Sequence, residues 1–151
     1  MWVVSDLDDV ERRLDGAAYV TLIFDVDNTL APQGAPPDQF GGLVNDAIDR
    51  FESHRAVSRV IALTNGPQRD VTRMISRGNK PWTTRRRLGL DRAKCVCVVG
   101  DQVMTDGVLA WRLGATFMQL VIADEGEAPR QALMRRLGRS LSSLLFRREP
   151  G

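Results

Sequence analysis

Long hydrophobic runs are absent from this sequence of 151 residues. None of its apolar stretches approaches the roughly 20 residues that a membrane-spanning helix needs. The chain has two cysteines, separated by one residue, and such a pair does not make a disulfide framework. The N-terminus lacks a basic segment followed by a long apolar one, so we expect no secretory signal. Internal repeats and low-complexity tracts are also missing, and together these absences favour a cytoplasmic protein.

A dominant charge of one sign is missing as well. The net charge of +2 is too small to indicate a nucleic-acid partner. Residues 1–75 nevertheless carry a net charge of −5, and residues 76–151 carry +7. Arginine supplies 19 of the 21 basic residues, so one interpretation is a compositional bias that places arginines on solvated faces. The other interpretation is a basic half that faces an anionic partner.

The composition is that of an ordinary globular domain, with 43% hydrophobic and 26% charged residues. The length predicts a single domain over 1–151. Short apolar runs rich in β-branched residues predict buried strands at 19–24, 57–63, 94–99 and 115–122. Spacing and capping residues predict helices behind Ser5 up to Gly16, over 38–55, after Pro67 up to Gly78, and over 82–88, 103–113 and 130–146.

Strands that alternate with helices predict βαβ units and therefore an α/β fold with a parallel sheet. The strands are nearly continuous apolar runs, which are typical of strands covered by helices on both faces. We therefore expect a three-layer, Rossmann-like domain with a core over about 19–123. In such sheets ligands bind at the carboxyl ends of the strands, so we expect the chemistry just after residues 24, 63 and 99.

Polar residues follow three of the predicted strands at these points. They are Asp25-Val-Asp-Asn-Thr-Leu30 after the first strand, Thr64-Asn-Gly66 after the second and Gly100-Asp-Gln-Val-Met-Thr-Asp106 after the third. Carboxylates that converge on one edge repel each other unless a cation compensates them. Hard oxygen ligands without nearby histidine or cysteine suit Mg²⁺. Lys80, one of two lysines, could pair its ammonium with a phosphoryl group.

Each motif alone has a simpler interpretation, because Asp, Asn and Gly after a strand are common in turns. Their joint occurrence, each after a predicted strand and in this order, favours a functional site. The residues resemble the four motifs of the haloacid-dehalogenase-like (HAD) superfamily, over about 19–123. The Asp-Asn-Thr-Leu ending of the first motif, Lys80-Pro81 and the segment from Gly100 to Asp106 are similar to subfamily IIIA. Its YqeG-like branch resembles phosphatidylglycerophosphate phosphatases of phospholipid synthesis.

The resemblance implies a phosphatase that works through an aspartyl-phosphate. Asp25 would be the nucleophile, and Asp27 would protonate the leaving oxygen and then deprotonate the hydrolytic water. Thr64 and the backbone N–H of Asn65 would bind phosphate oxygens, and Lys80 would neutralise charge on the nucleophile and the phosphate. The acid at position 27 implies a hydrolase rather than a protein that retains its phosphoryl group.

The resemblance also implies an Mg²⁺ cofactor, held by the carboxylates of Asp25 and Asp101 and by the backbone carbonyl of Asp27. Asp106 would orient a metal-bound water or Lys80. The segments 28–37 and 65–79 are too short to hold a folded cap domain, so we expect an open site. An open site favours a large or surface-bound phosphorylated substrate, of which phosphatidylglycerophosphate is the leading candidate.

Other residues with chemical potential have structural interpretations. Cys95 and Cys97 alternate with valines, so we expect both thiols on one side of a buried strand as core residues. His54, the single histidine, is expected to have a surface role. Trp82 and Trp111 lie in helical patterns and are expected in the core.

Three alternatives stay open at this point. Arg85-Arg86-Arg87 could bind phosphate or lie on a solvated helix face. The helix over 130–146 carries leucines at helical spacing and arginines in its first half, so it either packs on the sheet or makes reversible contact with an anionic membrane surface. The function could also be that of a soluble-metabolite or nucleotide phosphatase, or of a non-catalytic phosphate-sensing module. The sequence does not distinguish a monomer from an oligomer.

Overall fold

A computed structural model gives the fold of the protein, and its described residues are 1–17, 20–32, 34–66, 74–76, 80–91 and 95–121. The predicted helix over 130–146 lies outside these residues, and so do both interpretations of it, packing on the sheet and contact with an anionic membrane surface. None of the described helices is both long and apolar enough to pass through a lipid bilayer.

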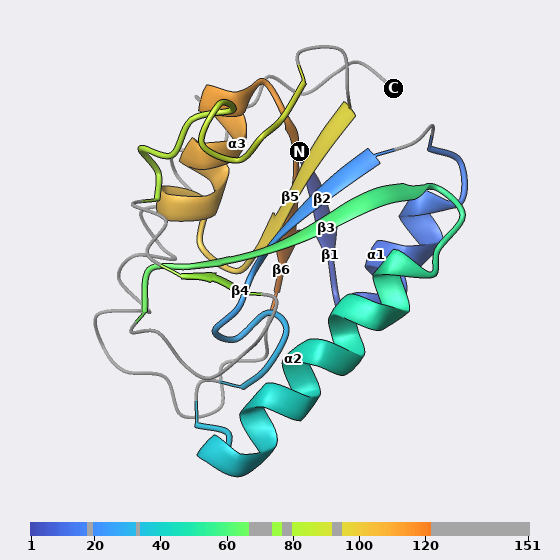
Figure 1. Ribbon diagram of the computed structural model, residues 1–151. Helices are drawn as coiled ribbons and strands as arrows, with labels where there is room; N and C mark the ends of the chain where they lie inside the picture. The colour runs from blue at the N-terminus through green and yellow to red at the C-terminus, as the bar shows by residue number, and fades with distance from the viewer. Residues whose placement is uncertain (18–19, 33, 67–73, 77–79, 92–94, 122–151) are drawn as a thin grey trace.

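The described strands form one sheet in which every neighbouring pair is parallel, as predicted (Figure 1). Its strands, in the spatial order β1-β6-β5-β2-β3-β4, are β1 Trp2–Val4, β6 Thr116–Leu120, β5 Cys95–Gly100, β2 Val20–Asp25, β3 Val57–Thr64 and β4 Met74–Ser76. The α-helices are α1 Leu7–Leu14, α2 Pro37–Glu52 and α3 Val108–Leu113, the last preceded by a π-helical turn over Val103–Gly107. The predicted α/β class is therefore confirmed.

The sheet buries apolar side chains on both of its faces, because successive strand residues point to opposite sides. On one face, Phe24 of β2 belongs to the same buried cluster as residues of α1 and α2, and its ring lies 4.8 Å from the ring of Phe51. On the other face, Ile23 packs in a second cluster with Leu109 and Leu113 of α3. Each fully buried side chain of this size contributes about 1.5–3 kcal/mol to folding. This packing fixes the central strands whose ends carry the polar motifs.

The N-terminal segment differs from the prediction in two respects. Residues Trp2–Val4 form an edge strand that pairs with β6, and three residues are too few to show a strand pattern in a sequence. The residue that caps α1 is Asp6 rather than Ser5. The carboxylate of Asp6 accepts the backbone N–H of Asp9 at 2.7 Å and the hydroxyl of Ser5 at 2.9 Å, which satisfies a donor that the helix leaves unpaired.

Two predicted helices between β3 and β5 are wrong. Met74 and Ile75 lie in the edge strand β4, since hydrogen bonds with β3 are available there; the rest of that predicted helix lies outside the described residues. The segment 82–88 forms hydrogen-bonded turns, with the Leu88 N–H donating to the Thr84 carbonyl at 3.2 Å. It ends at Gly89, whose φ of +62° suits a residue without a side chain.

The other elements match their predictions to within a few residues. The helix expected over 103–113 begins as the π-helical turn and continues as α3. It ends at Gly114 with a φ of 61°, the left-handed conformation typical after a helix. Cys97 is buried as expected.

Three side chains predicted for the core are exposed instead. Cys95 is exposed at the first residue of β5. Trp82 and Trp111 are 60% and 57% exposed. Trp82 does not lie in a helix, and Trp111 lies on the outer side of α3. The guanidinium of Arg112 covers the Trp82 ring at 4.8 Å.

Candidate functional site

The carboxyl ends of β2, β3 and β5 lie next to each other in the middle of the sheet. Asp25 is the last residue of β2, Thr64 the last of β3 and Gly100 the last of β5. Because all three strands are parallel, the polar segments that follow them meet at one edge. The structure thus brings together residues separated by about 75 positions in the sequence.

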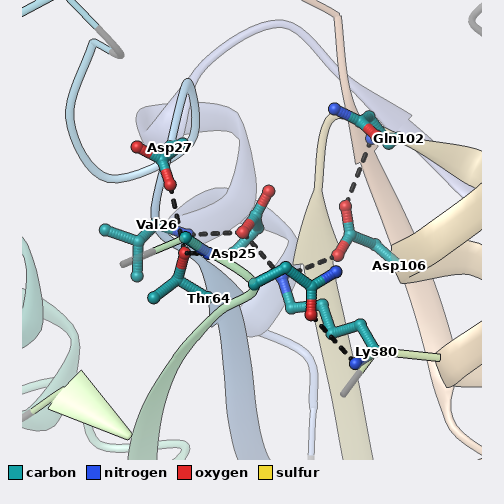
Figure 2. A network of polar contacts seen from close by, with 9 residues as sticks. Asp25, Val26, Asp27, Thr64, Lys80, Gln102 and Asp106 are labelled. Atoms are coloured by element: carbon teal, nitrogen blue, oxygen red, sulfur yellow. Dashed lines mark hydrogen bonds and ion pairs between the residues drawn. The ribbon is translucent and has the colours of Figure 1, made fainter. Parts of the chain in front are cut away.

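A buried ionic cluster lies at the centre of this edge (Figure 2). The ammonium of Lys80 donates to Oδ1 of Asp25 at 2.6 Å and to Oδ1 of Asp106 at 3.0 Å. The side chains of Lys80, Asp106 and Asp25 are 2%, 0% and 13% exposed. The backbone N–H of Lys80 also donates to the side-chain oxygen of Asn65 at 3.0 Å. A buried charge is tolerated when it is paired and hydrogen-bonded in this way.

The charges in the cluster do not balance. Burial and the neighbouring Asp106 carboxylate raise the pKa of Asp25 to about 7, although Lys80 opposes the shift. Burial disfavours the charged form of Lys80, but the carboxylates of Asp106 and Asp25 outweigh it and raise the pKa of Lys80. One ammonium therefore stands against an excess of carboxylates, so the cluster attracts a further cation or a proton.

The oxygen atoms available at this edge fit a hard divalent cation. Asp25, Asp101 and Asp106 each offer one carboxylate oxygen, and these oxygens all lie within 4.8 Å of one another. Asp101 is 3% exposed, so its carboxylate is held against the cluster rather than in solvent. A set made of carboxylate oxygens, with no sulfur or imidazole in it, suits Mg²⁺.

Gly100 is the residue that lets Asp106 reach the cluster. A Cβ atom at position 100 would lie 2.4 Å from Cγ and from Oδ2 of Asp106. The π-helical turn then fixes the carboxylate, because the backbone N–H of Gln102 donates to Oδ2 of Asp106 at 3.2 Å. A glycine is therefore required here for a close approach of a side chain to the backbone.

Asp27 and Thr64 form the opposite side of the site. In Figure 2 they lie on the other side of Asp25 from Asp106 and Gln102. The hydroxyl of Thr64 donates to Oδ2 of Asp27 at 3.1 Å and accepts the backbone N–H of Gly66 at 2.8 Å. Oδ1 of Asp25 also accepts the backbone N–H of Val26 at 2.8 Å. The two aspartates of the first motif thus have different partners, one an ammonium and the other a hydroxyl.

A cavity of about 270 Å³ opens above these groups. Five of the predicted site residues line it, namely Asp25, Asp27, Thr64, Asn65 and Lys80, together with Asn28, Gly66, Gln102 and Thr105. Asp101 and Asp106 contribute to the cluster and not to the lining. All seven predicted site residues therefore lie at one edge of the sheet, in two sets.

Sequence reasoning assigned no role to Gln102 and Thr105, although both lie in the motif from Gly100 to Asp106. The signal available was their position between Asp101 and Asp106, but an ordinary helical turn does not predict which of these residues share a side. Outside the cavity, the Arg85 guanidinium donates to the backbone carbonyls of Leu113 at 2.6 Å and Asp91 at 2.7 Å. Arg85 therefore anchors its turn to the end of α3.

A larger groove of about 700 Å³ lies between α1 and α2, away from the strand ends. Three arginines line it, and one of them, Arg50, is paired with Asp8 at 2.6 Å and with Glu11. His54 lies there too, where its Nδ1 accepts the backbone N–H of Ala56 at 3.2 Å. Exposed ion pairs such as those of Arg50 contribute about 0–1 kcal/mol to stability. None of the site residues predicted from the sequence lines this groove, whereas five of them line the smaller cavity.

No family model, curated protein or solved structure matches this chain. The resemblance to the HAD superfamily therefore stays a prediction. A functional proposal for this chain therefore rests on the distances, burial and charges of the residues at the strand ends.

Proposed function

We propose that the protein is an Mg²⁺-dependent phosphomonoester hydrolase of the HAD type, acting through an aspartyl-phosphate on Asp25. The observation that carries the proposal is the position of Lys80, whose ammonium bonds to Asp25 and to Asp106 in a buried cluster. A cluster with this excess of carboxylates is costly to bury. Such a cluster is useful in a site that binds a divalent cation together with a phosphoryl group, because the cation compensates the carboxylates and the ammonium attracts the phosphoryl oxygens.

The arrangement of the fold supports the proposal. Buried clusters on both faces of the sheet are what a three-layer HAD-like core requires. The segment between β2 and α2 folds back on itself, since the N–H of Asn28 donates to the Ala31 carbonyl at 2.8 Å. We propose that the site works without a cap domain, because a segment this short and compact leaves no room for one.

The nucleophile is held in one orientation by its neighbours. Oδ1 of Asp25 accepts both the Lys80 ammonium and the Val26 N–H, so the plane of the carboxylate is fixed. An ionised oxygen of Asp25 attacks the phosphorus and displaces the alcohol oxygen, and Lys80 stabilises the negative charge on the phosphoryl oxygens. The product of this step is a phosphoryl group on Asp25.

Asp27 is placed to move the protons. In the first step it donates a proton to the leaving alcohol oxygen, and in the second it takes a proton from the water that attacks phosphorus. Phosphate leaves and the Asp25 carboxylate is restored. The Thr64 hydroxyl, now 3.1 Å from Asp27, lies at the same edge and can donate to a phosphate oxygen, as can the backbone N–H of Asn65.

The residues that would hold Mg²⁺ are Asp25 and Asp101 through their carboxylates and Asp27 through its backbone carbonyl, with Asp106 beside them. When bound, the ion supplies positive charge for the phosphoryl oxygens and lowers the pKa of Asp25 below its metal-free value of about 7. Asp25 is then ionised and competent to attack at neutral pH.

The test is the release of phosphate from p-nitrophenyl phosphate by the purified protein, with Mg²⁺ and with excess chelator. We expect turnover that needs Mg²⁺ and falls at least about 10³-fold in Asp25→Asn, since removal of a covalent nucleophile is among the most severe changes in catalysis. The matched control is Asp46→Asn, because Asp46 is an exposed acid on α2. Absence of phosphate release, or turnover that survives Asp25→Asn, contradicts the proposal.

Phosphatidylglycerophosphate remains the leading large substrate on the sequence resemblance. Its recognition by a membrane-associated 130–146 helix depends on residues outside those described. The alternative of a phosphate-sensing module is separated by the same variant, because a sensor that does not form a phosphoenzyme binds phosphate equally well with Asn at position 25.

A further inference from the structure

Two side chains on the rim of the cavity take no part in the ionic cluster. Gln102 and Thr105 both line the cavity and are both partly exposed. Neither side chain has a hydrogen-bond partner among the described residues. Their amide and hydroxyl groups are therefore available to a ligand that fills the cavity.

The backbone beneath these two side chains is firmly held. The carbonyl of Gln102 accepts the N–H of Asp106 at 2.8 Å and that of Gly107 at 3.3 Å, and the Gln102 N–H donates to the Asp106 carboxylate at 3.2 Å. In the same π-helical turn, Val103 is 2% exposed and belongs to the core. The turn thus anchors one side in the core and presents Gln102 and Thr105 to the cavity, which lowers the entropic cost of binding through them.

The chemistry of the lining restricts what this part of the cavity can recognise. Every described residue of the lining is polar or glycine. Among the described residues, therefore, none contributes an aromatic ring that could stack on a nucleobase, and none contributes an aliphatic side chain that could cover an acyl chain. Amide and hydroxyl groups are neutral and both donate and accept hydrogen bonds. Their natural partners are hydroxyl groups, which have the same dual character.

We propose that Gln102 and Thr105 determine specificity by hydrogen-bonding hydroxyl groups of the leaving alcohol, so that the site prefers phosphate monoesters of polyhydroxylated alcohols. The proposal rests on the hydrolase function proposed above and deepens it. The cluster of Asp25 and Lys80 binds the phosphoryl end, while the two rim residues bind the carbon chain next to it. A cavity of about 270 Å³ is just below the usual range for small-molecule sites, and so it suits a compact leaving group.

The test compares two esters that share a carbon skeleton, erythritol 4-phosphate and n-butyl phosphate, with the full-length protein and Mg²⁺. We expect kcat/KM to favour the polyol ester by about 2- to 12-fold for each hydroxyl that is bound, because a net hydrogen bond contributes roughly 0.5–1.5 kcal/mol. Thr105→Val and Gln102→Met should each lower this ratio by about 2- to 12-fold. Thr116→Val, an exposed threonine at the opposite end of the sheet, should leave the ratio unchanged.

The ratio separates recognition from structural damage, since a misfolded site lowers kcat/KM for both esters together. Equal kcat/KM for the two esters in the unmodified protein overturns the inference. So do Thr105→Val and Gln102→Met variants that keep the original ratio. If these results come from a protein that still hydrolyses p-nitrophenyl phosphate and needs Asp25 to do so, the hydrolase function stands and the inference alone fails. A protein that hydrolyses none of the three esters overturns the function and the inference with it.

Discussion

Replacing Lys80 by methionine tests whether the ionic cluster is as tightly coupled as its geometry indicates. Methionine keeps most of the side-chain length but removes the ammonium that bonds to Asp25 at 2.6 Å and to Asp106 at 3.0 Å. The Asp106 side chain is fully buried and the Asp25 side chain is 13% exposed, so water solvates the Asp25 carboxylate only in part and the Asp106 carboxylate not at all. Removing one partner of a buried ion pair costs about 3–5 kcal/mol, and we expect a loss of this size at pH 8.

The loss should depend on pH with a definite sign. Lys80 lowers the pKa of Asp25, which is about 7 in the folded protein against 3.8 for a free side chain, so the variant raises that pKa further. A folded-state pKa above the unfolded value means that stability falls as the pH rises from about 4 through the folded pKa. Protonation of Asp25 relieves the repulsion at pH 5. The variant should therefore be closer to the unmodified protein at pH 5 than at pH 8.

The assay is urea unfolding followed by circular dichroism, in buffer with excess chelator, at pH 5 and pH 8. The double variant Lys80→Met/Asp106→Asn is the matched control. It removes the Asp106 carboxylate, which repels the Asp25 carboxylate once the ammonium is gone, and it should recover part of the lost stability. A decrease in unfolding free energy below about 1 kcal/mol at pH 8 would refute the reasoning, since that is the size expected of exposed pairs. A loss of equal size at both pH values would refute it as well.

Three further predictions follow from single contacts. Gly100→Ala should destabilise the fold by about 2–3 kcal/mol, because its Cβ would lie 2.4 Å from a buried carboxyl group. Gly42→Ala is the control, in the middle of α2 where a Cβ meets no other atom, and it should stabilise the fold by about 0.5–1 kcal/mol. Urea unfolding measures both changes. Maleimide should label the exposed Cys95 in the folded protein but not Cys97, since burial raises the pKa of the Cys97 thiol to about 12 and keeps it neutral at pH 8; intact-mass measurement counts the adducts. Mg²⁺ should raise the midpoint of thermal unfolding, by the equivalent of about 2.7 kcal/mol at 100 times its Kd, and Asp101→Asn should remove most of that shift.

Each of these predictions has a result that contradicts it. Equal effects of the two glycine substitutions would mean that the close approach at position 100 is relieved without cost. Rapid labelling of both thiols in the absence of urea would show that β5 is not buried as described. An unchanged response to Mg²⁺ in Asp101→Asn would remove that residue from the proposed ligands.

Much of the fold follows from local pattern. The four buried strands were predictable because apolar β-branched runs of this length occur where helices cover both faces of a sheet. The convergence of Asp25, Thr64 and Asp101 followed from the rule that parallel strands carry ligands at their carboxyl ends. The meeting of these three residues at one edge was therefore predictable from local pattern, whereas the roles of Lys80 and Asp106 were predicted from the resemblance to the HAD superfamily.

The parts that failed depend on tertiary contacts. Met74 and Ile75 satisfy a helical spacing, but β3 offers them an open strand edge, and this pairing decides their conformation. Trp82 and Trp111 are large and apolar, yet both are exposed, Trp82 outside any helix and Trp111 on the outer side of α3. Cys95 fits the alternation of side chains along its strand, but it is the first residue of β5. At this position the side chain is exposed, and burial begins at the next residue.

The functional rim was out of reach for a related reason. An ordinary α-helical turn after Gly100 would distribute side chains at 100° intervals, and the sequence carries no sign that Val103–Gly107 forms a wider π-helical turn. That turn decides that Asp106 reaches Lys80 while Gln102 and Thr105 line the cavity. Contacts of this kind arise only when the strands, the turn and the lysine are assembled together.

The most direct test of the central claim is to locate the phosphoryl group during turnover. The protein is mixed with ³²P-labelled p-nitrophenyl phosphate and Mg²⁺, quenched in acid and treated with borohydride, which reduces an aspartyl-phosphate to homoserine. The account predicts acid-stable label on the quenched protein and, after reduction, homoserine at position 25. Both signals should be absent from Asp25→Asn and present in Asp46→Asn. Phosphate release without any label on the protein, or homoserine at another aspartate, would contradict the account.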